Sequence, residues 1–115
     1  SRMTKSFRDL IVWQKSRDSA VAIYQLTDQF SPSERYGLTS QMRRAVISIS
    51  SNIAESYHPF HAREKKHLLM VAFGSGSELE SQLEVATVLF PNHDYRRAGE
   101  LLQEVMKILN SFLSR

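Results

Sequence analysis

The sequence predicts an all-α fold, an antiparallel up-down-up-down four-helix bundle, and three observations favour it. Apolar residues recur at spacings of three and four along four long segments, which is the periodicity of amphipathic helices. Short connections join the segments and are typical of antiparallel neighbours. Only four glycines and three prolines occur in 115 residues, too few for a protein of many β-turns. We expect one domain over residues 9–113 and a tail over residues 1–8, of which residues 1–2 resemble a cloning remnant.

The first helix is expected over residues 9–30, with Asp9 as its N-cap. Its apolar stripe consists of Leu10, Trp13, Ala20, Ile23, Tyr24 and Thr27. Ser31, Pro32 and Glu34 follow in the order of a capping box, which predicts one short turn before Gly37.

The second helix is expected over residues 38–57 and the third over residues 61–89. The core face of the second is Leu38, Met42, Ala45, Val46, Ile49 and Ile53. The main stripe of the third is Leu68, Ala72, Ser75, Leu79, Leu83, Ala86 and Phe90. Gly74 and Gly76 lie inside the third helix and cost about 1 kcal/mol each relative to alanine. We expect close approach of another helix to offset that cost.

The fourth helix follows the break at Pro91, with Asp94 as its cap, and ends near Leu113. Its apolar face is Leu101, Leu102, Val105, Ile108, Leu109 and Phe112. Because each helix follows its neighbour after a short connection, the four segments complete the bundle.

Composition narrows the class of protein. The net charge is +3, which is mildly basic, and it is uneven, because residues 1–44 carry a net +4 and the rest of the chain a net −1. The chain has no cysteine, which excludes disulfides and thiolate metal sites and suits a reducing compartment. No apolar run reaches the roughly 18 residues of a membrane span, and no signal peptide is visible. We expect a cytoplasmic protein without a membrane partner.

The second and third helices carry more apolar side chains than one bundle face can bury. Residues 68–73 are six apolar residues in a row, and a helix that is apolar nearly all round is normally buried all round. We therefore predict a subunit interface beside the core face, the alternative being a wider core. Its candidate residues are Arg43, Ile47, Ala54, Leu69, Met70 and Phe73.

A second row on the residue 38–57 helix is polar and predicts a network between helices. Its candidate residues are Gln41, Arg44, Ser48, Asn52 and Glu55, with Glu78 and Glu80 across the bundle. The two glutamates are candidate partners for Arg43 and Arg44, because guanidinium groups bind carboxylates in a two-pronged geometry. Phosphate binding by the same arginines is the alternative. No oriented base adjoins a serine, so we expect no nucleophile and no enzyme activity.

Two Glu-x-x-His pairs, Glu55 with His58 and Glu64 with His67, have a spacing that occurs in di-iron helical bundles. Both flank Pro59 at one end of the bundle, whereas such sites also need carboxylates from the other two helices. We favour solvated or loop-capping histidines and expect no metal or cofactor.

Basic residues near the starts of the first and third helices should meet at one end of an antiparallel bundle. The candidate rim is Arg8, Lys15, Arg17, Arg63, Lys65 and Lys66, together with Arg2 and Lys5. A cationic rim would bind nucleic acid through phosphate contacts, with salt-dependent affinity. Candidate stacking residues are Phe7, Tyr57 and Phe60.

Several motifs resemble one bacterial family. They are FRDLIVWQK at residues 7–15, YGLTSQMRRA at 36–45, Ser48-Ile49, NIAE at 52–55 and SELESQLE at 77–84. Together they resemble the 23S ribosomal RNA intervening-sequence protein family over nearly the whole chain. The resemblance implies a four-helix bundle, a ring-like homopentamer and a link to RNA, with no settled biochemical activity. Ser56 stands where the family has glycine, and residues 57–60 partly replace its basic stretch.

We therefore expect a non-enzymatic, homo-oligomeric bundle protein. Its candidate partners are other copies of itself and RNA or a nucleic-acid-processing protein. The alternatives are an assembly scaffold without nucleic acid and an enzyme with an unrecognised di-metal or novel site.

Overall fold

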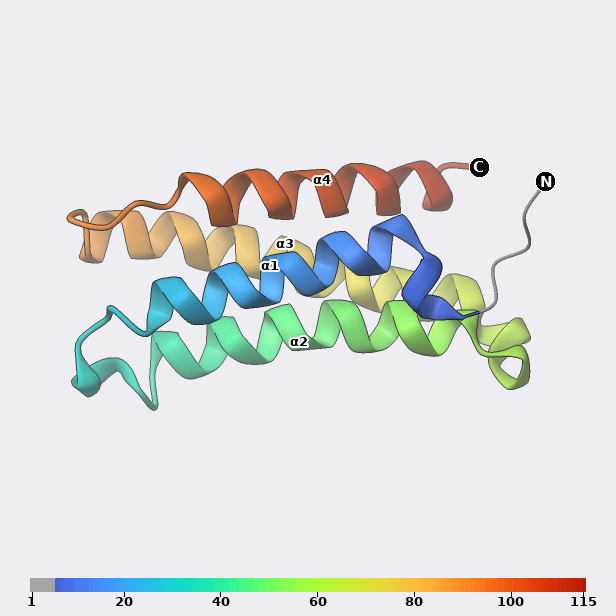
Figure 1. The fold of residues 1–115 in the computed structure, drawn as a ribbon, viewed down its shortest axis with the longest axis horizontal. Helices are drawn as coiled ribbons and strands as arrows, with labels where there is room; N and C mark the ends of the chain where they lie inside the picture. The colour runs from blue at the N-terminus through green and yellow to red at the C-terminus, as the bar shows by residue number, and fades with distance from the viewer. Residues whose placement is uncertain (1–5) are drawn as a thin grey trace.

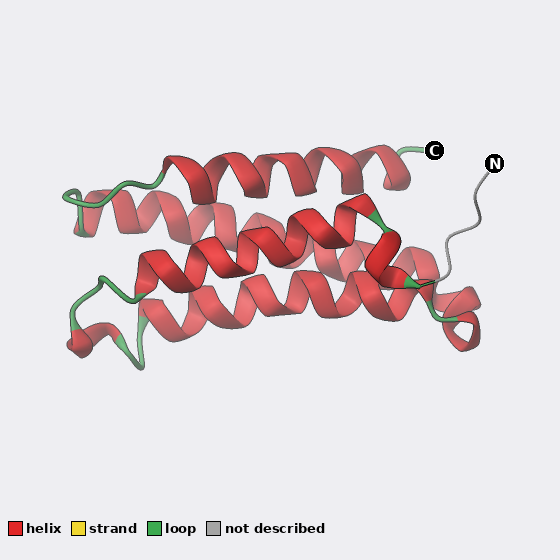
Figure 2. Cartoon of the chain, in the orientation of Figure 1, coloured by secondary structure: helices red, strands yellow, loops and turns green. Residues whose placement is uncertain are grey.

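The computed structural model describes residues 6–115, and these form helices joined by short connections, without a β-strand in that range (Figure 2). The four α-helices are α1 (Ile11–Thr27), α2 (Leu38–Tyr57), α3 (Lys65–Leu89) and α4 (Arg96–Leu113). Three short 3-10 helices are η1 (Phe7–Asp9), η2 (Pro32–Glu34) and η3 (Pro59–Glu64). Arg2 and Lys5 of the predicted rim lie outside the described residues.

The helices pack in a ring that follows chain order, α1 on α2, α2 on α3, α3 on α4 and α4 on α1 (Figure 1). Consecutive helices run antiparallel, so the predicted up-down-up-down bundle is confirmed. The molecule is 46 × 24 × 23 Å. The bundle end formed by η1, η3 and the C-terminus of α4 is called the η3 end below; η2 and the α3–α4 connection form the opposite end.

The core face of α2 is the one that its apolar spacing predicts. Met42, Val46, Ile49 and Ile53 are fully buried, and only Leu38 of the predicted set is half-buried. These side chains meet apolar residues of the other three helices along the bundle axis. The fully buried apolar partners include Ile23, Leu79, Leu102, Val105 and Leu109.

The predicted core stripe of α1 is wrong in part. Ile23 and Thr27 are buried, but Tyr24 is exposed, and the two serines Ser16 and Ser19 occupy core positions instead. The hydroxyl of Ser16 donates a hydrogen bond to the carbonyl oxygen of Trp13 at 2.7 Å, which satisfies it within the helix. The other buried positions of this face are Val12, Ala22 and Leu26.

Helix starts differ from the predictions where a 3-10 turn intervenes. Asp9 lies in η1 and is not the cap of α1, whose N-cap position is held by Leu10 without a side-chain hydrogen bond. His58 caps η3, so α3 begins at Lys65 and not at residue 61. The N-cap position of α4 is Tyr95 and not the predicted Asp94, although Asp94, one residue earlier, accepts the backbone N–H of Arg96 at 3.0 Å.

The turn after α1 follows the predicted pattern in part. Ser31 caps η2 by accepting the N–H of Ser33, one residue earlier than a capping box would place it. Gly37 then separates η2 from the start of α2.

The two glycines of α3 have different surroundings. A Cβ at Gly76 would overlap Sδ of Met106 on α4 and lie 3.2 Å from its Cε, so this glycine permits close helix contact as predicted. A Cβ at Gly74 would meet nothing within 4 Å, because this position is exposed. Within the described subunit, the prediction of close approach therefore fails at Gly74.

Candidate functional site

The predicted basic rim divides into paired and unpaired cations. Lys15 of α1 pairs with Glu104 of α4 at 3.0 Å, and Arg17 pairs with the neighbouring Asp18 at 3.1 Å. Both pairs are partly exposed and therefore contribute little to stability. Because their charges already have protein partners, these two side chains are weak candidates for phosphate contacts.

Four cations gather at the η3 end, as antiparallel topology requires. Arg63 lies on η3, and Lys65 and Lys66 form the first turn of α3. Arg115, which the sequence prediction missed, follows α4 and stacks over Phe112 with 5.2 Å between guanidinium carbon and ring centre. Among the described residues, no ion pair involves Arg63, Lys65 or Lys66.

Arg8 is exposed beside these residues. Its guanidinium donates to the Ser6 hydroxyl at 3.1 Å and lies 4.6 Å from the Phe7 ring centre. It thus stays close to its own 3-10 turn.

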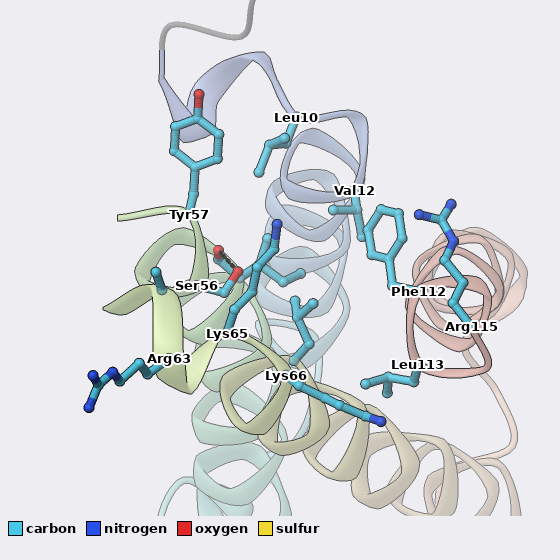
Figure 3. A pocket seen from close by; sticks show the side chains of 13 residues that line it. Leu10, Val12, Ser56, Tyr57, Arg63, Lys65, Lys66, Phe112, Leu113 and Arg115 are labelled. Carbon is cyan, nitrogen blue, oxygen red and sulfur yellow. Dashed lines mark hydrogen bonds between the residues drawn. The ribbon is translucent and has the colours of Figure 1, made fainter. Parts of the chain in front are cut away.

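A cavity of about 470 Å³ opens between these cations (Figure 3). Its walls come from Leu10, which joins η1 to α1, and from α1, α2, η3, α3 and the end of α4. The apolar lining consists of Leu10, Val12, Ile53, Ala62, Leu69, Phe112 and Leu113. The remaining lining residues are Ser56, Tyr57, Arg63, Lys65, Lys66 and Arg115. We call this cavity the end pocket; no acidic residue of residues 6–115 lines it.

The three candidate stacking residues have unequal access. Phe7 packs edge-on against Trp13 with ring centres 4.9 Å apart, and Tyr57 is half-buried at the wall of the end pocket. Phe60 is 90% exposed beside His58, so its ring is the most available surface for a base.

The predicted polar network is smaller than expected. The hydroxyl oxygens of Ser48 and Ser75 lie 2.8 Å apart across α2 and α3, and the amide of Asn52 donates to the carbonyl oxygen of Ser48 at 2.8 Å. Ser75, assigned by sequence to the core stripe, is thus the partner on α3. The side chains of the other predicted members are exposed and make no hydrogen bond within the described part of the chain: Gln41, Arg44, Glu55, Glu78 and Glu80.

Arg43 joins α2 to α1 within one subunit. Its Nε donates to Thr27 Oγ1 at 2.8 Å, and its Nη2 pairs with Asp28 Oδ1 at 2.8 Å. Its guanidinium also lies 4.4 Å from the ring centre of Tyr24. The prediction that Glu78 or Glu80 would pair with Arg43 is wrong, because the side chain turns to the end of α1 and not toward α3.

The candidate interface residues differ in their exposure to solvent. Leu69 is only 6% exposed and belongs to the core, so its predicted position on a side stripe is wrong. Phe73 is half-buried between α3 and α4, and Ala54 is half-buried on α2. Ile47 and Met70 are exposed, as an interface would require.

The Glu-x-x-His pairs do not form a metal centre in the described residues. No three histidine, aspartate or glutamate side chains converge there. Glu64 pairs with Nδ1 of His61 at 2.8 Å, and Nδ1 of His58 accepts the backbone N–H of Phe60 at 3.2 Å. Both histidines therefore have contacts within η3.

At the opposite end, Tyr95 closes the C-terminus of α3. Its hydroxyl donates to the carbonyl oxygens of Phe90 at 2.7 Å and Ala86 at 3.1 Å, and burial raises the pKa of the phenol. Hydrogen bonds from Arg96 lower the pKa of Asp94. These contacts complete the helix ends. A cavity of about 440 Å³ beside Tyr95 and Arg96 is lined by Glu80, Glu84 and Glu100, so it lacks the cationic rim of the end pocket.

No described helix is both long and apolar enough to cross a bilayer. A family model described as 23S rRNA-intervening sequence protein matches residues 8–111. No curated protein matches the chain.

Proposed function

Because the chain belongs to the 23S rRNA-intervening sequence protein family, we propose that it is a non-enzymatic homo-oligomer, a pentamer, that binds RNA. The observation that carries the proposal is the group of unpaired cations at the η3 end. Arg63, Lys65 and Lys66 lie within four residues of one another and have no carboxylate partner in residues 6–115. Exposed Phe60 on the same turn supplies an aromatic face for a base.

RNA binding by such a surface is electrostatic and weakly sequence-specific. Each phosphate that a cation neutralises releases counterions, so the affinity falls as salt rises, with a log–log slope of about −0.7 per contact on single strands. A ring of copies repeats the three cations around its rim. The proposal therefore favours a single-stranded RNA long enough to touch more than one subunit.

Association of copies is supported by apolar side chains on the outer face of α3. Met70, Val85 and Val88 are 54%, 47% and 80% exposed, and their spacing places them with Gly74 on one stripe. Gly74 costs the helix about 1 kcal/mol without a close neighbour in its own subunit. Packing of a second copy against this stripe would bury the apolar groups and offset that cost. The number five rests on the family resemblance.

RNA binding is tested by fluorescence anisotropy with a labelled single-stranded RNA. The dissociation constant is measured at several salt concentrations between roughly 50 and 200 mM, a range over which phosphate contacts weaken measurably. The double variant Lys65→Gln/Lys66→Gln should reduce the magnitude of the salt slope by about 1.4, because two phosphate contacts are lost. Arg97→Gln/Lys107→Gln removes the same charge from exposed positions of α4 and should leave the slope unchanged. No binding at low salt, or equal slopes for both variants, would contradict the RNA proposal.

Assembly is tested by light scattering at micromolar concentration. We expect a mass five times the 13.2 kDa of one chain. Val85→Asp should dissociate the assembly because it buries a charge in the contact, whereas Gln103→Asp on exposed α4 should not. If the unmodified protein is a monomer, the assembly proposal is refuted. If it is a pentamer that does not bind RNA, the alternative of an assembly scaffold without nucleic acid is supported instead.

A further inference from the structure

We propose that the end pocket binds a small amphipathic anion, an aliphatic carboxylate such as decanoate. This site is distinct from the proposed RNA surface, although Lys65 and Lys66 contribute to the binding of both ligands. It rests on a cavity whose floor is aliphatic and whose rim is cationic, so that both halves of one ligand find a complementary surface.

The floor of the pocket reaches the bundle core. Ile53, Val12 and Leu69 are at most 6% exposed, yet all three line the cavity. Its volume of about 470 Å³ falls within the range of about 300–1,000 Å³ that is common for small-molecule sites. Each methylene group that leaves water for such a surface strengthens binding by about fourfold. An alkyl tail is therefore the part of a ligand that this floor favours.

The rim supplies the charge for the head of the ligand. In Figure 3 the ammonium group of Lys65 projects into the space that Leu10, Val12 and Tyr57 surround, while Lys66 extends toward Leu113. Arg63 points away from the cavity in the same view. A carboxylate that enters with its tail on the floor can thus meet Lys65 without leaving the pocket, and Lys66 lies at the mouth.

Nearby charges leave this preference for an anion in place. The acidic residues of this end are Asp9, Glu55 and Glu64, and none of them lines the pocket. Glu64 is paired with His61. The C-terminal ends of α2 and α4 carry partial negative charges of about half a unit, and the N-terminal ends of α1 and α3 carry opposite charges of the same size. The lysine charges therefore dominate the potential at the mouth.

A nucleobase is a poorer occupant of the floor. Base recognition needs free donors and acceptors at the edges of the ring. Two lining residues, Ser56 and Tyr57, carry a hydroxyl, and Ser56 Oγ already donates to the carbonyl oxygen of Ile53 at 2.6 Å. The surrounding residues are mostly aliphatic, so the pocket offers shape and apolar area without an edge-specific pattern.

The test is isothermal titration of the full chain with decanoate, decan-1-ol, acetate and adenosine monophosphate, each below its aggregation concentration. We expect one saturable decanoate site per subunit, with binding at least tenfold weaker for the uncharged alcohol and for the acid without a tail. Amide NMR shifts should concentrate at the pocket, around Leu10, Ile53 and Leu113. Equal binding of decan-1-ol, tighter binding of the nucleotide, or shifts elsewhere would overturn the proposal.

Two variants separate this site from the RNA surface. Ala62→Trp places a large ring at the exposed mouth without changing charge, so decanoate affinity should fall at least tenfold while the RNA salt slope stays constant. Lys65→Gln/Lys66→Gln should weaken both ligands, and Arg97→Gln/Lys107→Gln neither. Circular dichroism melts confirm that each variant is folded. The protein is also sedimented with phosphatidylglycerol vesicles. If it binds the vesicles but not free decanoate, the proposed ligand site is refuted and binding to a membrane surface is indicated instead.

Discussion

Alanine substitution should stabilise the protein at Gly74 and should not do so at Gly76. Both positions are inside α3, so each gains about 1 kcal/mol of helix propensity on replacement of glycine by alanine. Only the Gly76 substitution brings a new methyl group against another helix, where it would overlap Sδ of Met106. Met106 is 7% exposed, so its side chain must shift toward the cavity that it lines with Phe73 and Glu80 to admit the methyl group.

The magnitude follows from the difference between the two variants. Overpacking of a core by one methyl group costs about 1–3 kcal/mol. Gly74→Ala should therefore stabilise the subunit by about 1 kcal/mol, and Gly76→Ala should be less stable than Gly74→Ala by about 1–3 kcal/mol. Since the propensity gain is common to both, their difference isolates the contact with Met106. It corresponds to roughly 4–12 °C in melting temperature.

Urea unfolding followed by circular dichroism measures both variants, at several protein concentrations because assembly adds to apparent stability. Met106→Ala combined with Gly76→Ala should lose less stability than the sum of the two single changes, because the methyl group then occupies vacated space. Equal stability of Gly74→Ala and Gly76→Ala would refute the packing argument. Loss of the oligomer in Gly74→Ala alone would show that a second copy approaches this position.

Three further changes test contacts at helix ends. Arg43→Lys should cost about 0.5–1.5 kcal/mol in urea unfolding, because a lysine cannot bond Thr27 and Asp28 together. Tyr95→Phe should cost about 1–2 kcal/mol by the same measurement, since the carbonyl oxygen of Phe90 loses this donor and that of Ala86 keeps only the backbone N–H of Phe90. Asp94→Asn should destabilise the protein near neutral pH, and the difference should vanish as the pH falls below the ordinary aspartate value of 3.8, because a lowered pKa stabilises the fold only while the carboxylate is charged.

Spacing predicts a helix face well where large apolar residues occupy it and poorly where small polar ones do. The α2 face was predictable because Met42, Ile49 and Ile53 repeat at helical intervals, and its buried polar residues, Thr39 and Ser56, lie only at the two ends of the helix. On α1, Ser16 and Ser19 are buried because a small side chain fits a close helix crossing, and hydropathy ranks serine as a surface residue.

Consecutive apolar residues also leave the rotation of a helix undetermined. Leu68 and Leu69 define two stripes about 100° apart. The structure buries Leu69 and leaves Leu68 half-buried, and this choice depends on how α3 meets its neighbours. Local sequence carries no information about that contact.

The position of the cations was predictable, but their partners were not. Antiparallel topology brings Arg63, Lys65 and Lys66 to the end where α1 begins, and the same reasoning would have added Arg115. The pairing of Lys15 with Glu104 depends instead on the rotation of α1 against α4 and on the reach of two long side chains. Such pairs form only after the helices have packed.

The polar residues of α2 explain why we place the proposed binding surface at the end of the bundle and not along its sides. Arg43 bonds α1, Ser48 bonds Ser75 on α3, and Asn52 donates to Ser48 within α2, so these groups are already hydrogen-bonded within the subunit. A ligand on that side would have to break these contacts before it gained its own. At the η3 end, Lys65 and Lys66 have no such partners in the described chain, and an anion adds contacts there without removing any.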